Sequence, residues 1–161
     1  MIFKQWRQVL NGTKTQTRRP VKPNEYAIHG APGYAELPIE AVLIKPRHAQ
    51  KWVVGRTYAV QPGRGKKSVG RIRITKIRRE RLGDISDADC YAEGILEVEI
   101  LDPLLRRLAH YPYHLVCPLC DGAYETPQSA YACLWDCCGG RWEQDQNDDV
   151  WALEFEKGPG L

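Results

Sequence analysis

No long run of hydrophobic residues occurs in this 161-residue sequence, and none approaches the roughly 18 residues that a membrane-spanning helix needs. The first seven residues, Met1–Arg7, lack the charged-then-apolar order of a secretion signal. Internal repeats and low-complexity tracts are also absent. With 43% hydrophobic and 27% charged residues, the composition is that of an ordinary globular protein. We therefore expect a single cytoplasmic domain over residues 1–161 that does not contact a membrane.

Acidic residues are scarce in the first half of the chain. Residues 1–81 hold 19 of the 23 lysines and arginines but only 4 of the 20 acidic residues, a balance of +15. Residues 82–161 have a balance of −12. A solvated surface of mixed charge is one explanation. Charge this strongly segregated also favours an anionic partner for the first half, with nucleic acid as the leading candidate.

The pattern of apolar residues, caps and breakers predicts an α+β domain. We expect helices over 3–11, 87–93 and 127–138, and strands over 51–61, 69–77 and 150–156. The alternating threonines of 13–20 indicate an extended segment that ends at Pro20. The proline-rich stretch 20–50 is expected to be mostly irregular. This order of elements suits a small, mostly antiparallel β-barrel flanked by short helices.

A basic hairpin is predicted around residues 61–73. Its glycine-rich turn carries Arg64, Lys66 and Lys67, and the strand after it carries Arg71 and Arg73 on one face. The turn lacks the spacing of a phosphate-binding P-loop. A flexible cationic tip and a basic strand face are suited to following a phosphate backbone. The alternative is an edge strand whose charges prevent aggregation.

Five of the six cysteines fall within 22 residues, at positions 117, 120, 133, 137 and 138. In a chain without a secretion signal, such a cluster favours metal binding over disulfides. Cys117 and Cys120 have the spacing of a zinc knuckle, and Cys133 and Cys137 lie one helical turn apart. We therefore predict a structural Zn²⁺ site made of Cys117, Cys120, Cys133 and Cys137. It would lie in residues 103–138, which comprise a zinc-binding insertion and the C-terminal helix.

Other ligand sets remain open. Cys138 could replace Cys133, and His110 or His114 could replace one of the thiolates. The cysteines could also be reduced, buried thiols that behave as small apolar side chains.

The segment Gly12–Arg19 resembles the Gly-x-Lys-Thr-x-Thr-x-Arg motif of ASCH domains, a family related to the PUA RNA-binding fold. Segments resembling the family's later motifs follow in the same order, at 54–60, 85–95 and 134–156. Two departures stand out: Arg56 replaces an aspartate that many members have, and 103–126 resembles an insertion. The resemblance implies a small barrel with a cleft between helices.

One branch of the ASCH family consists of small amidohydrolases that cleave N4-acetylcytidine with a lysine, a threonine and a glutamate. Carried over to this sequence, these residues are Lys14, Thr17 and Glu93. A threonine hydroxyl is a weak nucleophile until a base removes its proton, and a desolvated lysine can be that base. Lys14 and Thr17 would, however, point to opposite faces of a regular strand. In the structural alternative, Thr17 satisfies a backbone group and Lys14 forms a buried ion pair with Glu93.

Further residues suit recognition of a nucleotide. Arg18 and Arg19 could meet a phosphate or stack on a base, and Gln61 offers an amide to a base edge. Tyr26 and Trp52 are candidate stacking platforms. We expect an amidohydrolase that acts on an N4-acylated cytosine, as a modified nucleoside, in RNA or in DNA. The alternatives are a non-catalytic RNA- or DNA-binding module and, third, an accessory protein of a phage or mobile element whose insertion contacts another protein.

Overall fold

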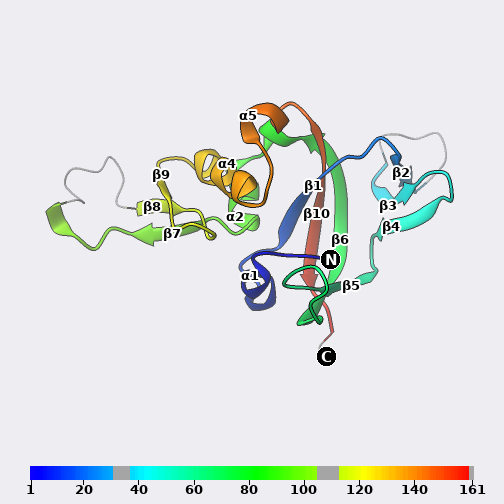
Figure 1. Ribbon diagram of the computed structural model, residues 1–161, viewed down its shortest axis with the longest axis horizontal. Helices are drawn as coiled ribbons and strands as arrows, with labels where there is room; N and C mark the ends of the chain where they lie inside the picture. Colours follow the sequence, from blue (N-terminus) through cyan, green and yellow to red (C-terminus); the bar gives the residue numbers. More distant parts are fainter. Residues whose placement is uncertain (31–36, 105–112, 160–161) are drawn as a thin grey trace.

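The computed structural model describes residues 1–30, 37–104 and 113–159. Within these residues, a seven-stranded antiparallel sheet is organised around two long strands, β6 (Gly70–Arg81) and β10 (Asp149–Lys157), as Figure 1 shows. The two strands pair along the whole length of β10. The other strands of this sheet are β1 (Gln16–Pro20), β2 (Glu25–His29), β3 (Ile39–Ile44), β4 (Ala49–Val53) and β5 (Thr57–Val60).

Alternating side chains explain why β6 lies at the centre of the sheet. Its inward-facing residues are Ile72, Ile74 and Ile77, all at most 3% exposed. Between them Arg71 and Arg73 face solvent. The strand predicted over 69–77 is confirmed, and β6 continues to Arg81.

The expected barrel is wrong, because the described strands do not close on themselves. The sheet order β1-β10-β6-β3-β2 leaves β1 and β2 at its two ends. Beyond β1, the backbone N–H of Thr15 donates to the carbonyl of Ala92 at the end of a helix (2.9 Å). A helix therefore lies at the edge where a closing strand would have to pair.

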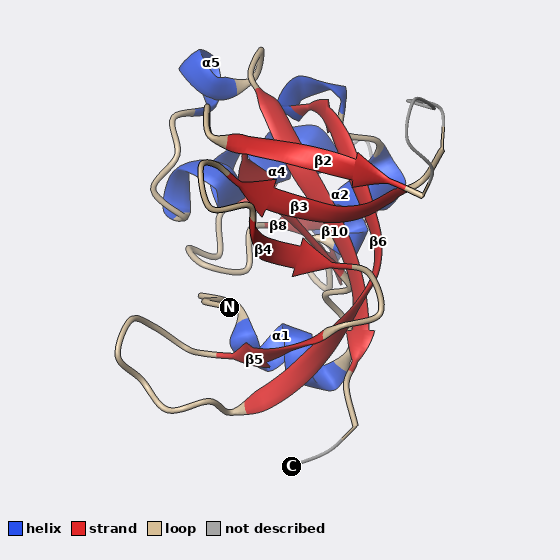
Figure 2. Ribbon diagram, turned by 90° about the vertical axis from the view of Figure 1, so that its right-hand side faces the viewer, coloured by secondary structure: helices blue, strands red, loops and turns tan. Residues whose placement is uncertain are grey.

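The expectation of an irregular segment over 20–50 is also wrong. β2, β3 and β4 form a three-stranded antiparallel unit there, and Figure 2 shows them side by side, crossing the direction of β6 and β10. Pro20 ends one strand, and Pro23, Pro38 and Pro46 lie between strands, where a missing N–H donor does not interrupt pairing. The strand expected over 51–61 is divided in two at Gly55, which has a φ of 81°.

The helices of the described residues are short, and two of them have a side-chain N-cap. They are α1 (Trp6–Asn11), α2 (Asp87–Ala92), α4 (Pro127–Cys137) and α5 (Trp142–Asp145), with a 3₁₀ turn η1 (Leu82–Asp84). Ser86 caps α2 by accepting from the Asp89 N–H, and Thr126 caps α4 by accepting from the Ser129 N–H. The helices predicted over 87–93 and 127–138 are thus confirmed. Among the described residues, no helix combines the length and the apolar character that a membrane crossing requires.

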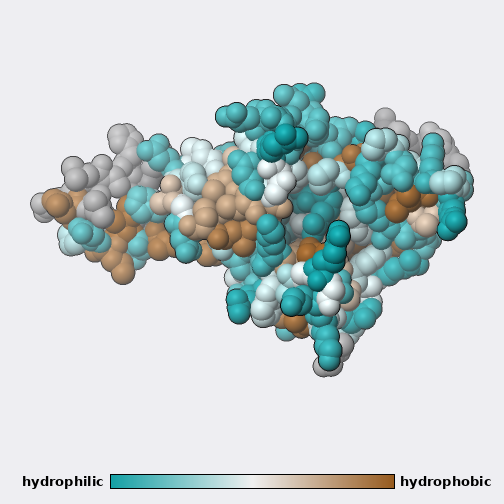
Figure 3. All heavy atoms as spheres, in the orientation of Figure 1, coloured by the Kyte–Doolittle hydropathy of each residue, from teal (hydrophilic) through white to brown (hydrophobic). Residues whose placement is uncertain are grey.

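A second sheet extends from the body as an arm (Figure 1). Its strands are β7 (Leu96–Glu99), β8 (Tyr113–Val116) and β9 (Ala123–Tyr124), paired in that order. Since β7 precedes residue 103, this sheet begins before the insertion predicted from the sequence. Apolar side chains are exposed along the arm, with Leu101 85% and Leu104 68% exposed, and Figure 3 shows the brown surface they contribute to.

Hydrophobic clusters connect the sheets and helices. One lies between β3, β4, β6 and β10, and another packs α1 against β5, β6 and β10. The third joins the arm to the body, because Leu115 and Cys117 share it with Tyr131 of α4 and Val150 of β10. The candidate site lies where α1, β1, α2 and α4 approach one another.

Candidate active site and cysteine cluster

Lys14 lies in the short connection between α1 and β1. Gly12 ends α1 in the left-handed conformation with a φ of 84°, and the Lys14 N–H donates to the Gln8 carbonyl (3.0 Å). The side chain is only 3% exposed. Because Lys14 precedes the regular strand, it is not bound by the alternation of β1. The geometric objection to Lys14 and Thr17 sharing a site is thereby removed.

Glu93 meets Lys14 from the end of α2. The Lys14 ammonium donates to Glu93 Oε2 (2.5 Å) and to the Glu93 backbone carbonyl (2.6 Å). The next residue, Gly94, has a φ of 97°, and a Cβ there would lie 2.7 Å from Gln8 Oε1. This glycine lets the end of α2 approach α1 closely, which brings the carboxylate to the lysine.

Thr17 faces the same cavity. Lys14, Thr17 and Glu93 all line a hollow of about 160 Å³, together with Ile2, Phe3, Lys4, Gln5, Arg18, Arg19, Tyr131, Leu134, Trp135 and Cys138. Thr17 is 5% exposed, and the described residues provide no hydrogen-bond partner for its hydroxyl. The Thr17 hydroxyl oxygen is not completely enclosed by protein, so it opens onto the cavity. The three residues expected to act together are thus brought together.

Burial controls the charge of Lys14. Removal from water lowers the pKa of its ammonium below the ordinary value of 10.5, and the adjacent Glu93 carboxylate opposes this effect only in part. A lysine with a lowered pKa is more readily neutral near physiological pH. It is therefore better suited to accept a proton than an exposed lysine.

Arg18 holds the other oxygen of Glu93. Its side chain is fully buried, and Nη1 donates to Glu93 Oε1 (3.2 Å) and to Gln16 Oε1 (2.5 Å). Nε donates to Glu80 (2.7 Å), and Nη2 lies 2.5 Å from Glu80 and 2.9 Å from Asp89. Nε makes one of these hydrogen bonds, Nη1 makes two and Nη2 makes one, and Nη2 also lies at ion-pair distance from Glu80. Arg18 is therefore a positioning residue whose charge is met by three carboxylates, and the phosphate contact expected from the sequence stays a prediction.

Replacing Arg18 with methionine is expected to destabilise the protein by about 3–5 kcal/mol, because Glu93 and Asp89 would lose their buried partner. Chemical denaturation followed by circular dichroism measures the change. The matched control is Arg73→Met, which removes an exposed ion pair with Glu156 and is expected to cost less than about 1 kcal/mol. Equal effects of the two substitutions would contradict a structural role for the Arg18 network.

Arg19, the next residue, has a different environment. Nη2 donates to the Ile2 carbonyl (2.6 Å), and the guanidinium lies 5.5 Å from the centre of the Phe3 ring. Nε is buried without a partner, and among the described residues no carboxylate lies within 4 Å of this guanidinium. Burial lowers the pKa of Arg19 from its usual value. Arg19 is thus a partly buried cation that lines the cavity, and the Glu93 carboxylate of the same cavity acts on it only from beyond ion-pair distance.

Gln61 does not line the cavity. Its side-chain amide donates to the Lys66 carbonyl (3.2 Å), and its backbone pairs with Met1 and Phe3. The expected stacking platforms are also elsewhere: Trp52 is 6% exposed in the core of the sheet, and Tyr26 bonds His48.

The basic hairpin is only partly free. Arg64, Lys66 and Lys67 are exposed in the turn, and among the described residues no carboxylate pairs with them. Arg71 donates to the Thr57 hydroxyl (3.1 Å), whereas Arg73 pairs with Glu156 of β10. Farther along β6, Lys76, Arg78 and Arg79 also have acidic partners. The charge separation along the chain is therefore largely neutralised where β6 meets β10.

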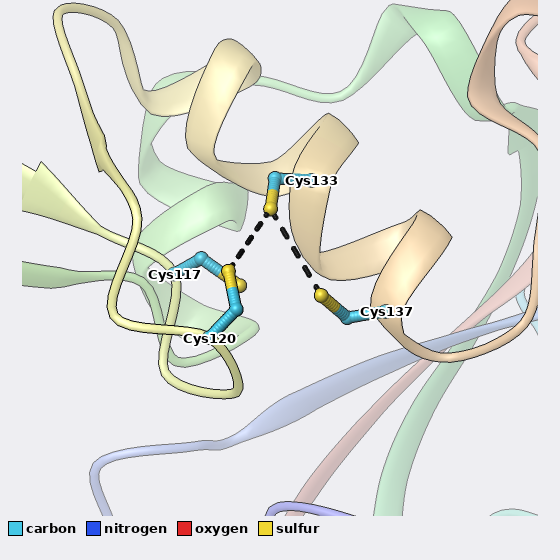
Figure 4. A group of neighbouring side chains, drawn as sticks. All are labelled: Cys117, Cys120, Cys133 and Cys137. Atoms are coloured by element: carbon cyan, nitrogen blue, oxygen red, sulfur yellow. Dashed lines mark hydrogen bonds between the residues drawn. The ribbon is translucent and has the colours of Figure 1, made fainter.

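The cysteine cluster joins the arm to α4. The ligand atoms of Cys117, Cys120, Cys133 and Cys137 all lie within 4.8 Å of one another. Figure 4 shows the first two in the loop after β8 and the last two on consecutive turns of α4, with all four thiols pointing toward one another. The Sγ atoms of Cys120 and Cys133 are 3.3 Å apart, and those of Cys133 and Cys137 are 3.9 Å apart. Around one tetrahedral zinc, sulfurs at about 2.3 Å from the metal would be roughly 3.8 Å apart, so the quartet can hold a metal ion.

The loop geometry fits this arrangement. The Cys117 N–H donates to the Gly122 carbonyl and the Asp121 N–H donates to the Cys117 carbonyl, each at 3.0 Å. Of the alternative ligands, Cys138 lies outside the group and lines the Lys14 cavity instead. His114 is in β8 and does not belong to the group either. His110 lies outside the described residues.

The two sites share α4. Cys133 and Cys137 meet the cluster, while Tyr131, Leu134 and Cys138 form part of the cavity wall. The Lys4 ammonium donates to the Cys137 carbonyl (2.7 Å), which also ties the N-terminal segment to this helix. A shift of the cysteine cluster would therefore move α4 and change the shape of the cavity.

No family model matches this chain, and no curated protein matches its sequence. Among solved structures, it is similar to the crystal structure of a DUF984 protein from Enterococcus faecalis V583, with a TM-score of 0.48 and 14% identity over 98% of this chain and 68% of the other. It is also similar to the ASCH domain from Lactobacillus crispatus JV V101, with a TM-score of 0.42 and 13% identity over 94% of this chain and 69% of the other. Likeness at this level carries no argument about chemistry, which must come from the residues of the site.

Several cavity residues were not found from the sequence. Gln5 donates to the Glu93 carbonyl (3.2 Å), and Tyr131 forms a buried wall beneath Arg18, 5.8 Å from its guanidinium. Cys138 was considered only as a metal ligand. Nothing in their local sequence separates Gln5 or Tyr131 from ordinary helix residues, since their partners are distant in the chain.

Proposed function

We propose that this protein is an amidohydrolase that cleaves the amide of an N4-acylated cytosine. The observation that carries the proposal is the buried Lys14–Glu93 pair, which shares one cavity with the open hydroxyl of Thr17. The same residue types at the same motif positions perform this reaction in the ASCH amidohydrolases that the sequence resembles. A hollow of about 160 Å³ is smaller than the roughly 300–1,000 Å³ of drug-sized sites and suits a single base with its acyl group.

In the first half of the reaction, neutral Lys14 removes the hydroxyl proton of Thr17 as Oγ1 attacks the acyl carbon. Glu93 orients the Lys14 amine by accepting a hydrogen bond from one of its N–H groups. The bond between the acyl carbon and N4 then breaks. Lys14 returns the proton to N4, and the cytosine amine leaves while the acyl group remains on Thr17.

In the second half, water hydrolyses the threonyl ester. Lys14 takes a proton from water, whose oxygen bonds to the acyl carbon, and the bond to Thr17 Oγ1 breaks. The proton returns to Oγ1, and the carboxylic acid is released. The lysine thus acts alternately as base and acid, which requires a pKa near the working pH.

For the cysteine cluster we propose a structural Zn²⁺. Four thiolates complete a tetrahedral site and leave no position for a reactive water, so this metal would not take part in the hydrolysis. It would fasten the loop after β8 to α4, where the small arm sheet contributes few buried side chains of its own.

Incubation with N4-acetylcytidine tests the proposal, since conversion to cytidine shifts the ultraviolet absorption. Thr17→Val preserves the shape of the side chain but removes the hydroxyl, and should lower turnover by at least about 10³-fold. Thr17→Ser keeps a hydroxyl and should retain measurable activity. Equal turnover by the wild type and Thr17→Val would mean that Thr17 is not the nucleophile.

A non-catalytic RNA-binding module is the second candidate, favoured by Arg64, Lys66 and Lys67 in the exposed turn, which pair with no carboxylate of the described residues. It would be supported by salt-dependent binding of an RNA oligonucleotide without turnover of any acylated cytosine, weakened by neutralising Lys66.

A further inference from the structure

A second hollow opens beside the reaction cavity. It has a volume of about 260 Å³ and shares Arg18, Arg19, Trp135 and Cys138 with the first. Its remaining walls are Pro20, Gly139, Gly140 and Asp145. Together the two hollows reach the size of a nucleotide site, whereas the first alone holds only a base.

Arg19 lines both hollows, and no carboxylate of the described residues forms an ion pair with it. Adjacent Arg18 pairs with three carboxylates, whereas the described contacts of the Arg19 guanidinium are the Ile2 carbonyl and the face of Phe3, with Glu93 acting from farther away. The Nη1 atom of Arg19 has no acceptor among the described residues and is not completely enclosed by protein, so it opens onto the hollows. Withdrawing a cation from water without a counter-charge is costly. A bound anion would restore the balance.

The walls of the second hollow leave room for a sugar and its phosphate. Gly139 has a φ of 97°, with no atom within 4 Å of where a Cβ would be, and a Cβ on Gly140 would lie 2.1 Å from the Trp135 indole nitrogen. The two glycines therefore keep side chains out of the entrance to the second hollow. Asp145 Oδ2 is held by the Trp135 indole N–H (2.9 Å) and the Arg141 N–H (2.8 Å), which leaves Oδ1 to accept a sugar hydroxyl.

We infer that the substrate is a cytidine that carries a phosphate, and that Arg19 pairs with this phosphate while the acylated base occupies the Lys14 cavity. The inference rests on the proposed function for the base end of the substrate. Two sources share this chemistry: a free nucleotide with a phosphate monoester, and RNA with phosphate diesters.

The test compares kcat/KM for N4-acetylcytidine, its 5′-monophosphate and a short RNA with one N4-acetylcytidine. A charge-assisted pair with Arg19 should favour at least one phosphorylated substrate over the nucleoside by about 10- to 100-fold. Arg19→Gln should reduce that ratio to about 1, whereas the control Arg47→Gln, an exposed arginine outside both hollows, should preserve it. The faster of the two phosphorylated substrates identifies the source.

Two results would overturn the inference. One is equal kcat/KM for all three substrates in the wild-type protein. The other is an Arg19→Gln variant that loses kcat equally on nucleoside and nucleotide with an unchanged ratio, because Arg19 would then act on the reacting amide.

Calorimetric binding of cytidine 5′-monophosphate and cytidine separates this inference from the proposed function. Tighter binding of the monophosphate that Arg19→Gln abolishes supports the phosphate subsite even where no amide is cleaved. Equal binding of the two compounds, together with hydrolysis of N4-acetylcytidine, would refute the subsite and leave the hydrolase intact.

Discussion

Lys14→Met is expected to lower kcat/KM for N4-acetylcytidine by about 10³-fold, because it removes the general base proposed to take the Thr17 proton. Methionine fills the buried volume, and Glu93 keeps its contact with Arg18 (3.2 Å), so the variant should remain folded by circular dichroism. Lys76→Met, an exposed lysine on β6, is the matched control and should retain full activity.

A second substitution distinguishes a base from a structural ion pair. Lys14→Arg keeps a cation beside Glu93 but cannot lose its proton at any accessible pH. It should be as inactive as Lys14→Met while still able to pair with Glu93. An active Lys14→Arg would show that the ammonium contributes only charge, as in the structural alternative drawn from the sequence.

The pH dependence of kcat/KM tests the same role of Lys14 as a base. Because burial lowers the pKa of Lys14 below 10.5, the neutral, proton-accepting form appears at lower pH than in an exposed lysine. We expect kcat/KM of the wild type to rise with pH and to reach half its maximum below 10.5. Any residual activity of Lys14→Met should lack this rising limb.

Removing the metal site is expected to have the largest effect on stability. Cys133→Ser takes away the central thiol of the cluster, which contacts both Cys120 and Cys137. Structural zinc binding is worth about 10–16 kcal/mol in small zinc domains, and even a loss of about 4 kcal/mol would lower Tm by roughly 10 °C in a chain of this size. Thermal unfolding with elemental analysis of the purified protein measures both quantities.

Cys138→Ser is the control for this experiment. Its thiol lies outside the cluster, so one zinc per chain should remain. Protein purified without chelators that contains no zinc would remove the metal proposal. If the wild type binds zinc but Cys133→Ser matches it in Tm, the metal has no structural role.

The KM for the substrate can be measured on the same purified variants, because the cavity wall includes residues of α4. Since α4 carries Cys137 and the wall residues Tyr131 and Leu134, loosening its last turn should also weaken substrate binding. A rise in KM of Cys133→Ser that accompanies zinc loss, with the zinc-containing wild type as the comparison, would reveal this connection.

Local patterns predicted the elements well where one face of each had to be buried. The alternating isoleucines of β6 and the capping residue Ser86 act over a few residues, so their effects can be read without tertiary information. The cysteine quartet belongs to the same class, because Cys133 and Cys137 share a helix face and Cys117 and Cys120 share a turn. The sequence does not predict β2 and β3, because prolines between strands resemble prolines in irregular chain.

Closure of the sheet and the roles of neighbouring arginines depended on the tertiary structure. Nothing in the local sequence distinguishes Arg18 from Arg19, yet one is surrounded by Glu80, Asp89 and Glu93 and the other opens onto two hollows. Those carboxylates are 62 to 75 residues away along the chain. Sequence by itself determined the candidate residues and several of the short elements that hold them. Only the packing of α2 and α4 beside β1 decided which charges are neutralised and which remain available to a ligand, because burial and pairing are set by contacts between distant segments.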